Sequence, residues 1–178
     1  MRIRLLKGDI TAQEVDVIVN AANSSLLGGG GVDGAIHRAA GPELLEHCKK
    51  LRATTVRDGL PVGSAVATPA GELAAGWVVH TVGPNRHIGQ VDPRLLASAY
   101  SESLDAAASL GAETVAFPAI SAGVYGWDPD EVGDVAASVV SRGRWPDIEE
   151  VRFVLFSDDV LVAFRHAFDA AGVAYGER

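Results

Sequence analysis

The chain has 178 residues and a net charge of −8, with 15 lysines and arginines against 23 aspartates and glutamates. This length suits one domain with a sizeable core, and we expect that domain to span residues 1–178. The acidic balance argues against nucleic acid as a partner, because a negatively charged protein surface repels phosphates. The single cysteine, Cys48, excludes an intramolecular disulfide, and no apolar run approaches the roughly 18 residues of a membrane span, so a cytoplasmic protein is expected.

Short β-branched runs alternate with longer segments of helical periodicity. In chain order, the pattern predicts strands at residues 3–6 and 15–19, a helix at 34–51, strands at 65–67 and 78–82, a helix at 93–110, a strand at 114–117, a helix at 129–142, a strand at 151–156 and a helix at 158–171. This alternation predicts an α/β fold with a largely parallel or mixed sheet, covered by helices on both faces.

Polar residues follow most of the predicted strands. In an α/β sheet, ligands collect where loops meet at the carboxyl ends of the strands. The pattern therefore predicts one shared pocket, built from loops that carry Asp9, Asn20 with Asn23, residues 80–83, residues 121–126, and Ser157.

The most informative segment is the glycine run at residues 28–31, followed by Asp33 at a predicted helix start. Backbone without side chains can approach a ligand closely, and its N–H groups bind phosphate near a helix N-terminus. Asp33 either caps the helix or does chemistry beside a bound diphosphate, and the glycines alternatively form only a surface turn. Gly29, Gly31 and Gly34 match G-x-G-x-x-G, but no strand ends directly at the run, so a nicotinamide-dependent oxidoreductase is not favoured.

A second glycine-rich loop, residues 121–127, follows the strand at 114–117 and precedes a helix opened by Asp128 and Pro129. It is a candidate for a second phosphate-binding arm that faces the first. Its Tyr125 either stacks on a sugar or base or fills the core.

Three further polar residues have two interpretations each. Asn20 and Asn23 have amides that suit ribose hydroxyls, or they form turns after a strand. Asp9 accepts from an amine such as that of adenine, or it caps a short turn. The five histidines lack metal-binding spacing, so we assign no metal, and His80 is expected to be a hydrogen-bonded core residue.

Six segments occur in a characteristic order: Gly8-Asp9-Ile10-Thr11, Val17-Ile18-Val19-Asn20-Ala21-Ala22-Asn23, residues 28–33, Ile36-His37-Arg38-Ala39-Ala40-Gly41, His80-Thr81-Val82-Gly83-Pro84, and residues 117–126. Together they resemble the motifs of macrodomains, specifically of the MacroD-type ADP-ribosylglycohydrolases, over residues 3 to about 168. The resemblance implies a three-layer α/β/α sandwich with a mixed, mostly parallel six-stranded sheet.

The resemblance also implies roles for residues of this chain. Asp33 would be the catalytic acid, and Asn23 would orient the distal ribose beside it. Asp9 and Ile10 would contact the adenine, and Phe156 would cover the adenosine end of the ligand. The full set of implied substrate-binding residues is Asp9, Ile10, Asn20, Ala22, Gly28, Gly29, Gly30, Gly31, Val32, Ser121, Ala122, Gly123, Val124, Tyr125 and Phe156. The chain departs from the family pattern at Ala119 and Ala122, where Cys and Thr are common, and at Tyr125, where Phe is common.

The implied function is hydrolysis of mono-ADP-ribose from aspartate and glutamate side chains of modified proteins, together with deacetylation of O-acetyl-ADP-ribose. No cofactor or metal is implied, and the expected partners of this monomer are ADP-ribose and mono-ADP-ribosylated proteins. Two alternatives stay open. One is a reader module that binds ADP-ribose without turnover, and the other is removal of ADP-ribose from nucleic acid, which would need a basic groove that the sequence does not show.

Overall fold

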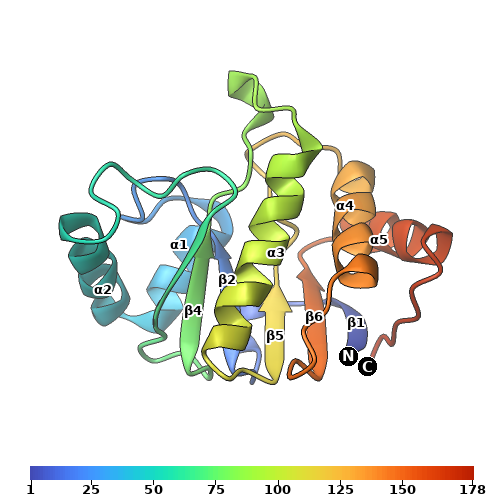
Figure 1. The fold of residues 1–178 in the computed structure, drawn as a ribbon, viewed down its shortest axis with the longest axis horizontal. Helices are drawn as coiled ribbons and strands as arrows, with labels where there is room; N and C mark the ends of the chain where they lie inside the picture. Colours follow the sequence, from blue (N-terminus) through green and yellow to red (C-terminus); the bar gives the residue numbers. More distant parts are fainter.

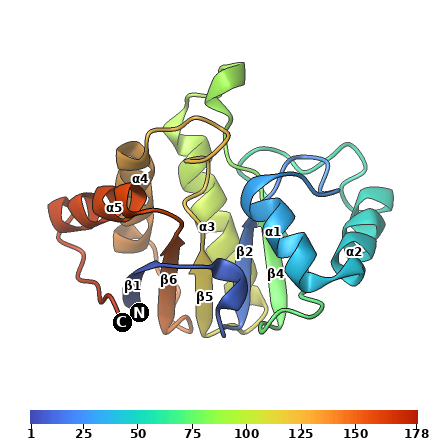
Figure 2. The same cartoon turned by 180° about the vertical axis from the view of Figure 1, so that it is seen from behind.

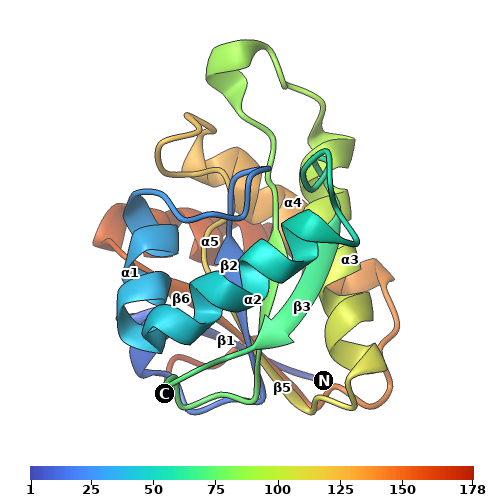
Figure 3. The same cartoon turned by 90° about the vertical axis from the view of Figure 1, so that its left-hand side faces the viewer.

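The computed structural model describes residues 1–178 and contains six strands, five α-helices and two short 3-10 helices. Their bounds are β1 Arg2–Lys7, η1 Ile10–Ala12, β2 Val17–Ala21, α1 Gly31–Ala40, α2 Pro42–Ala53, β3 Ala65–Pro69, β4 Trp77–Thr81, η2 Arg86–Ile88, α3 Pro93–Ser109, β5 Thr114–Phe117, α4 Pro129–Arg142, β6 Glu150–Leu155 and α5 Asp158–Ala170. The strands form one sheet in the order β1-β6-β5-β2-β4-β3 (Figure 1). Only β3, labelled in Figure 3, runs antiparallel to its neighbour. The predicted fold class is confirmed.

Alternation of side chains along the strands divides the core between the two faces of the sheet. In β6, Phe153 packs on one face and Val154 on the other, because successive side chains of a strand point to opposite sides. The largest core cluster joins the sheet to α3, α4 and α5, and the second joins it to α1, α2 and η1. A third, small cluster lies around Leu26 and Cys48. The two faces are seen in Figures 1 and 2, and the side view of Figure 3 shows α1 and α3 on opposite sides of the strands. No helix is both long and apolar enough to cross a membrane.

One prediction is wrong: the single helix expected at residues 34–51 is two helices. α1 ends at Ala40 and α2 begins at Pro42, with Gly41 between them at a φ of 80°. A proline disfavours helical backbone in the residue before it, and glycine adopts a left-handed φ without steric cost, so the chain turns here. α1 also begins earlier than expected, at Gly31. The other predicted ends lie within two residues of the observed ones.

The register of the central strands positions the site. β2 pairs in parallel with β4, and this pairing places Asn20 directly beside His80. β2 also pairs with β5, so the loops that follow β2, β4 and β5 leave the sheet at the same edge. Residues far apart in the sequence therefore meet at the carboxyl ends of these strands.

Candidate active site

A cavity of about 630 Å³ opens at the carboxyl ends of the parallel strands. Fourteen of the predicted site residues line it, namely Asp9, Ile10, Ala22, Asn23, Gly29, Gly30, Gly31, Val32, Asp33, Ser121, Gly123, Val124, Tyr125 and Phe156. Gly83, from the loop at residues 80–83 that was expected to reach the pocket, also lines it. Six lining residues were not predicted: Gly8, Ala21, Ala35, Pro118, Ala119 and Val154. Most of these six sit at or just beyond a strand end, and that position was the signal that could have identified them.

The glycine loop lies directly on the first turn of α1. A Cβ at Gly34 would fall 2.6 Å from the carbonyl oxygen of Gly29, so only a glycine at position 34 lets the loop lie this close to the helix. A Cβ at Gly29 would in turn lie 3.2 Å from both Asn23 Nδ2 and Asp33 Oδ2. The loop therefore places bare backbone, the helix N-terminus and two polar side chains on one wall of the cavity.

Asp33 is the acid of this wall. It is the third residue of α1, whose N-cap is Gly30, so the interpretation of Asp33 as the helix cap is wrong. The side chain is only 6% exposed. Its Oδ1 accepts a hydrogen bond from Asn20 Nδ2 at 2.8 Å and lies 3.4 Å from His37 Nε2, whereas Oδ2 lies toward Gly29. The protein thus holds one carboxylate oxygen and leaves the other without a hydrogen bond.

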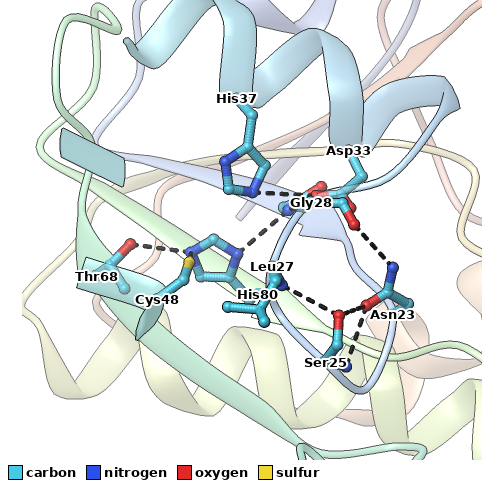
Figure 4. A network of polar contacts seen from close by, with 10 residues as sticks. Asn23, Ser25, Leu27, Gly28, Asp33, His37, Cys48, Thr68 and His80 are labelled. Atoms are coloured by element: carbon cyan, nitrogen blue, oxygen red, sulfur yellow. Dashed lines mark hydrogen bonds and ion pairs between the residues drawn. The ribbon is translucent and has the colours of Figure 1, made fainter. Parts of the chain in front are cut away.

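Asn23 is held in one orientation by its own loop (Figure 4). Its Oδ1 accepts from Ser25 N at 3.1 Å and from Ser25 Oγ at 2.5 Å, and its Nδ2 donates to the carbonyl oxygen of Gly28 at 3.0 Å. Turn formation, one of its two interpretations, is therefore correct. The side chain also lines the cavity, and the second hydrogen of Nδ2 has no acceptor in the protein. Asn23 can stabilise the loop and still donate to a ligand.

Asn20 does not reach the cavity, which corrects the expected contact between its amide and a ribose. β2 is buried on both faces, so its polar residue is enclosed: Asn20 is fully buried, with Nδ2 on Asp33 Oδ1 and 3.2 Å from His80 Nδ1. Gly28 and Ala122 likewise lie outside the cavity lining. Asn20 supports Asp33 from beneath the site.

His80, on β4, is a fully buried, hydrogen-bonded core residue, as predicted. Its Nε2 lies 2.9 Å from Thr68 Oγ1 and 3.8 Å from Cys48 Sγ. Burial and, next, the neighbouring His37 lower the pKa of His80 to about 4, against the opposing effect of Asp33. Burial and the charge of Asp33 raise the pKa of Cys48 to about 11. Both side chains are therefore uncharged near neutral pH.

The loop after β5 forms the opposite wall. Ser121 adopts a φ of 67°, which is uncommon outside glycine, and its Oγ is buried without a partner in the protein. A Cβ at Gly83 would collide with that Oγ, so the glycine after β4 keeps the space open. Tyr125 is half-buried and lines the cavity, so it does not fill the core. Asp33 and Tyr125 line the same cavity, and burial and, next, the charge of Asp33 raise the pKa of Tyr125.

The part of the cavity nearest β1 and β6 carries Asp9 and Phe156. Asp9 Oδ1 accepts from Thr11 N at 2.8 Å and Thr11 Oγ1 at 2.7 Å, so the capping interpretation is correct, and Oδ2 accepts nothing from the protein. Phe156 is 63% exposed. Because both residues line the cavity, this end offers a free carboxylate oxygen and an aromatic face.

Comparison with known proteins identifies the family. The sequence profile described as Macro domain matches residues 19–136. The chain belongs to the macrodomain family. A Macro domain-containing protein of Streptomyces griseus is 58% identical over 162 residues, which cover 91% of this chain and 92% of the relative. A relative from Klebsiella pneumoniae, named O-acetyl-ADP-ribose deacetylase, is 49% identical over 164 residues, which cover 90% of this chain and 93% of the relative.

Solved macrodomain structures share the whole fold. The Oceanobacillus iheyensis macrodomain with ADP has a TM-score of 0.88 and 38% identity, covering 93% of this chain and 90% of that chain. The Trypanosoma brucei macrodomain in complex with ADP-ribose has a TM-score of 0.83 and 34% identity, covering 93% of this chain and 68% of that chain. The three-layer macrodomain architecture implied by the sequence motifs is confirmed.

Proposed function

We propose that this macrodomain binds ADP-ribose in the cavity and hydrolyses esters at its distal ribose. The substrates are O-acetyl-ADP-ribose and mono-ADP-ribose attached to aspartate or glutamate side chains. The name of the Klebsiella relative supports the first substrate, and the ADP and ADP-ribose in the neighbouring structures support the binding.

The observation that carries the proposal is the carboxylate of Asp33 in a cavity wall that is otherwise made mainly of glycine backbone. The helix N-terminus of α1 favours anions, and the facing loops line the cavity with main chain and small residues. A carboxylate in such a wall weakens phosphate binding, so its presence there favours a chemical role. A module that only binds ADP-ribose has no use for it.

The ligand orientation follows from the two ends of the cavity. The free oxygen of Asp9 suits the adenine amine, and the face of Phe156 covers the adenosine. The two loops then hold the diphosphate, and the distal ribose comes next to Asn23 and Asp33. Backbone N–H groups do most of the phosphate binding, so Ala122, which lies outside the lining, leaves recognition intact.

The reaction adds one water across the ester, releasing ADP-ribose and a carboxylic acid. Asp33 Oδ2 can take the proton of the attacking water, or it can offset positive charge at the anomeric carbon if the sugar–oxygen bond breaks. These two routes put the water oxygen in different products. Hydrolysis in ¹⁸O-labelled water places the label in the acid for attack at the carbonyl and in the ribose for attack at the sugar.

The test is incubation with a protein mono-ADP-ribosylated on aspartate or glutamate, beside Ser-linked and Arg-linked controls and O-acetyl-ADP-ribose. We expect release from the first substrate and acetate from the last, with no release from the two controls. Asp33→Ala and Asn23→Ala should lose turnover and keep much of the ADP-ribose affinity. Tight ADP-ribose binding with no turnover on any substrate would instead establish a reader, and no binding at all would overturn both functions.

A further inference from the structure

A line of polar contacts runs from the edge strand β3 to Asp33, and the proposed chemistry leaves most of it unused. Thr68 Oγ1 lies 2.9 Å from His80 Nε2 (Figure 4). On the other side of the ring, His80 Nδ1 lies 3.2 Å from Asn20 Nδ2, and the same Asn20 nitrogen lies 2.8 Å from Asp33 Oδ1. All four residues are 5% exposed or less. Their polar atoms therefore depend on one another rather than on bulk water.

The protons on these atoms follow from the contacts. Asn20 Nδ2 has two hydrogens and faces two atoms, so it donates one to Asp33 Oδ1 and the other to His80 Nδ1. His80 Nδ1 must then be bare, and the ring proton sits on Nε2, where it is donated to Thr68 Oγ1. The ring is neutral near pH 7, because burial and His37 lower the pKa of His80 to about 4 although Asp33 opposes this.

We propose that His80 is a positioning residue for Asp33: its bare Nδ1 turns the Asn20 amide so that nitrogen, rather than oxygen, faces the carboxylate. This inference rests on the proposed hydrolase function, because hydrolysis requires the carboxylate in one orientation. A proton on His80 Nδ1 would draw the Asn20 oxygen toward the ring and therefore against Asp33 Oδ1, where two oxygens repel. Asn20 Oδ1 has no partner of its own, so only the two acceptors that face Nδ2, Asp33 Oδ1 and His80 Nδ1, select the amide orientation.

Thr68 completes the arrangement from the far side of the ring. A hydroxyl can accept or donate, so Thr68 does not select the tautomer itself, but it accepts the Nε2 proton once the Asn20 amide has taken Nδ1 as its acceptor. The thiol of Cys48 is 3.8 Å from the same nitrogen and uncharged, so it does not compete strongly for the proton. Thr68 thereby acts on the cavity without lining it.

The first test reads the tautomer directly in the unmodified protein. The ¹⁵N spectrum of the histidine side chains at pH 7 should show His80 protonated at Nε2 and bare at Nδ1. A proton on Nδ1, or a charged ring, would overturn the proposal. This measurement needs no substrate, so it decides the amide orientation even if the protein proves to have no hydrolase activity.

The second test uses two substitutions whose amides each replace one of the two ring nitrogens. In His80→Asn the side-chain oxygen can replace Nδ1 as acceptor, whereas in His80→Gln the amide reaches the Nε2 position and contacts Thr68. We expect His80→Gln to lower kcat roughly tenfold or more and His80→Asn to lower it by less than about threefold, with ADP-ribose affinity retained in both. Thr68→Val, which removes the hydroxyl, should lower kcat, whereas Thr68→Ser, which keeps it, should retain the kcat of the wild type.

Val78→Ala is the matched control for lost stability, because Val78 lies in the buried core of the same strand and outside the polar contacts. It should lower the melting temperature and leave kcat unchanged. The proposal would be overturned if His80→Asn and His80→Gln lost kcat equally, because His80 would then matter only for packing. It would also be overturned if Val78→Ala lost kcat in proportion to its fall in melting temperature. If the wild type has no turnover on any substrate, the proposed function fails instead.

Discussion

Gly34→Ala sets steric contact against helix propensity at the glycine loop. Position 34 lies in the first turns of α1, where Ala is ordinarily more favourable than Gly by about 1 kcal/mol. In this structure a Cβ there would lie 2.6 Å from the Gly29 carbonyl oxygen, whereas ordinary contact begins at 3.4 Å, a shortfall of 3.4 − 2.6 = 0.8 Å. The obstacle is backbone and cannot swing aside, so the loop or the helix must move.

The two contributions have opposite signs. Overpacking of this kind costs about 1–3 kcal/mol, and subtracting the helix-propensity gain of about 1 leaves a net loss of about 0–2 kcal/mol. For a protein of this size, that lowers the melting temperature by up to about 8 °C. Because the shift displaces Gly29 in the cavity wall, ADP-ribose affinity should also fall, by about tenfold or more.

Thermal unfolding followed by circular dichroism and titration calorimetry with ADP-ribose measure the two effects. Gly30→Ala is the matched control for stability, because its Cβ would meet nothing within 4 Å and its φ of −91° suits any residue. Its melting temperature should stay at or above that of the wild type. A Gly34→Ala protein that melts higher than the wild type and binds ADP-ribose equally well would show that the contact with Gly29 does not constrain the loop.

Three further predictions concern charge and capping. Asp33→Asn keeps an acceptor for Asn20 but removes the charge, so kcat should fall about 100-fold or more while calorimetry shows ADP-ribose affinity retained or increased. Burial acts to raise the pKa of Glu150, but the hydrogen bond from Arg152 and the surrounding arginine charges lower the pKa overall. The ionised Glu150 side chain therefore stabilises the folded protein fully above the ordinary pKa of glutamate, and this stabilisation is lost as the pH falls through the lowered pKa. Glu150→Gln should therefore lose less stability than the wild type in urea titrations as the pH is lowered to about 3. Asp128→Ala removes the side-chain acceptor at the N-cap of α4 and should cost about 1 kcal/mol, or about 2–4 °C, with turnover unchanged.

Each of these three has a clear contrary result. Undiminished turnover in Asp33→Asn would show that the reaction does not need the negative charge of Asp33. Parallel pH profiles for Glu150→Gln and the wild type would mean that the arginines do not stabilise the ionised carboxylate in the folded state. An unchanged melting temperature in Asp128→Ala would show that water replaces the cap.

Most of the cavity lining was predictable because it consists of loops with distinctive local chemistry. The glycine run before Asp33 and the glycine-rich loop that holds Tyr125 both lie between a predicted strand and a predicted helix, and both line the cavity. The six lining residues that were missed are apolar or glycine, such as Gly8 and Val154, which carry no chemical signal of their own. Their place in the cavity depends on how the strands are arranged.

The amino-acid sequence by itself determined the fold class, the six strands, most helix ends and the two glycine-rich loops, because hydrophobic periodicity and the conformational freedom of glycine act locally. Only the tertiary structure decided that Asp33 is not a helix cap, that Asn20 lies beneath it, and that His80 touches Asn20 across 60 residues of chain. Those contacts come from strand order and register, which bring distant residues together and which no local pattern encodes.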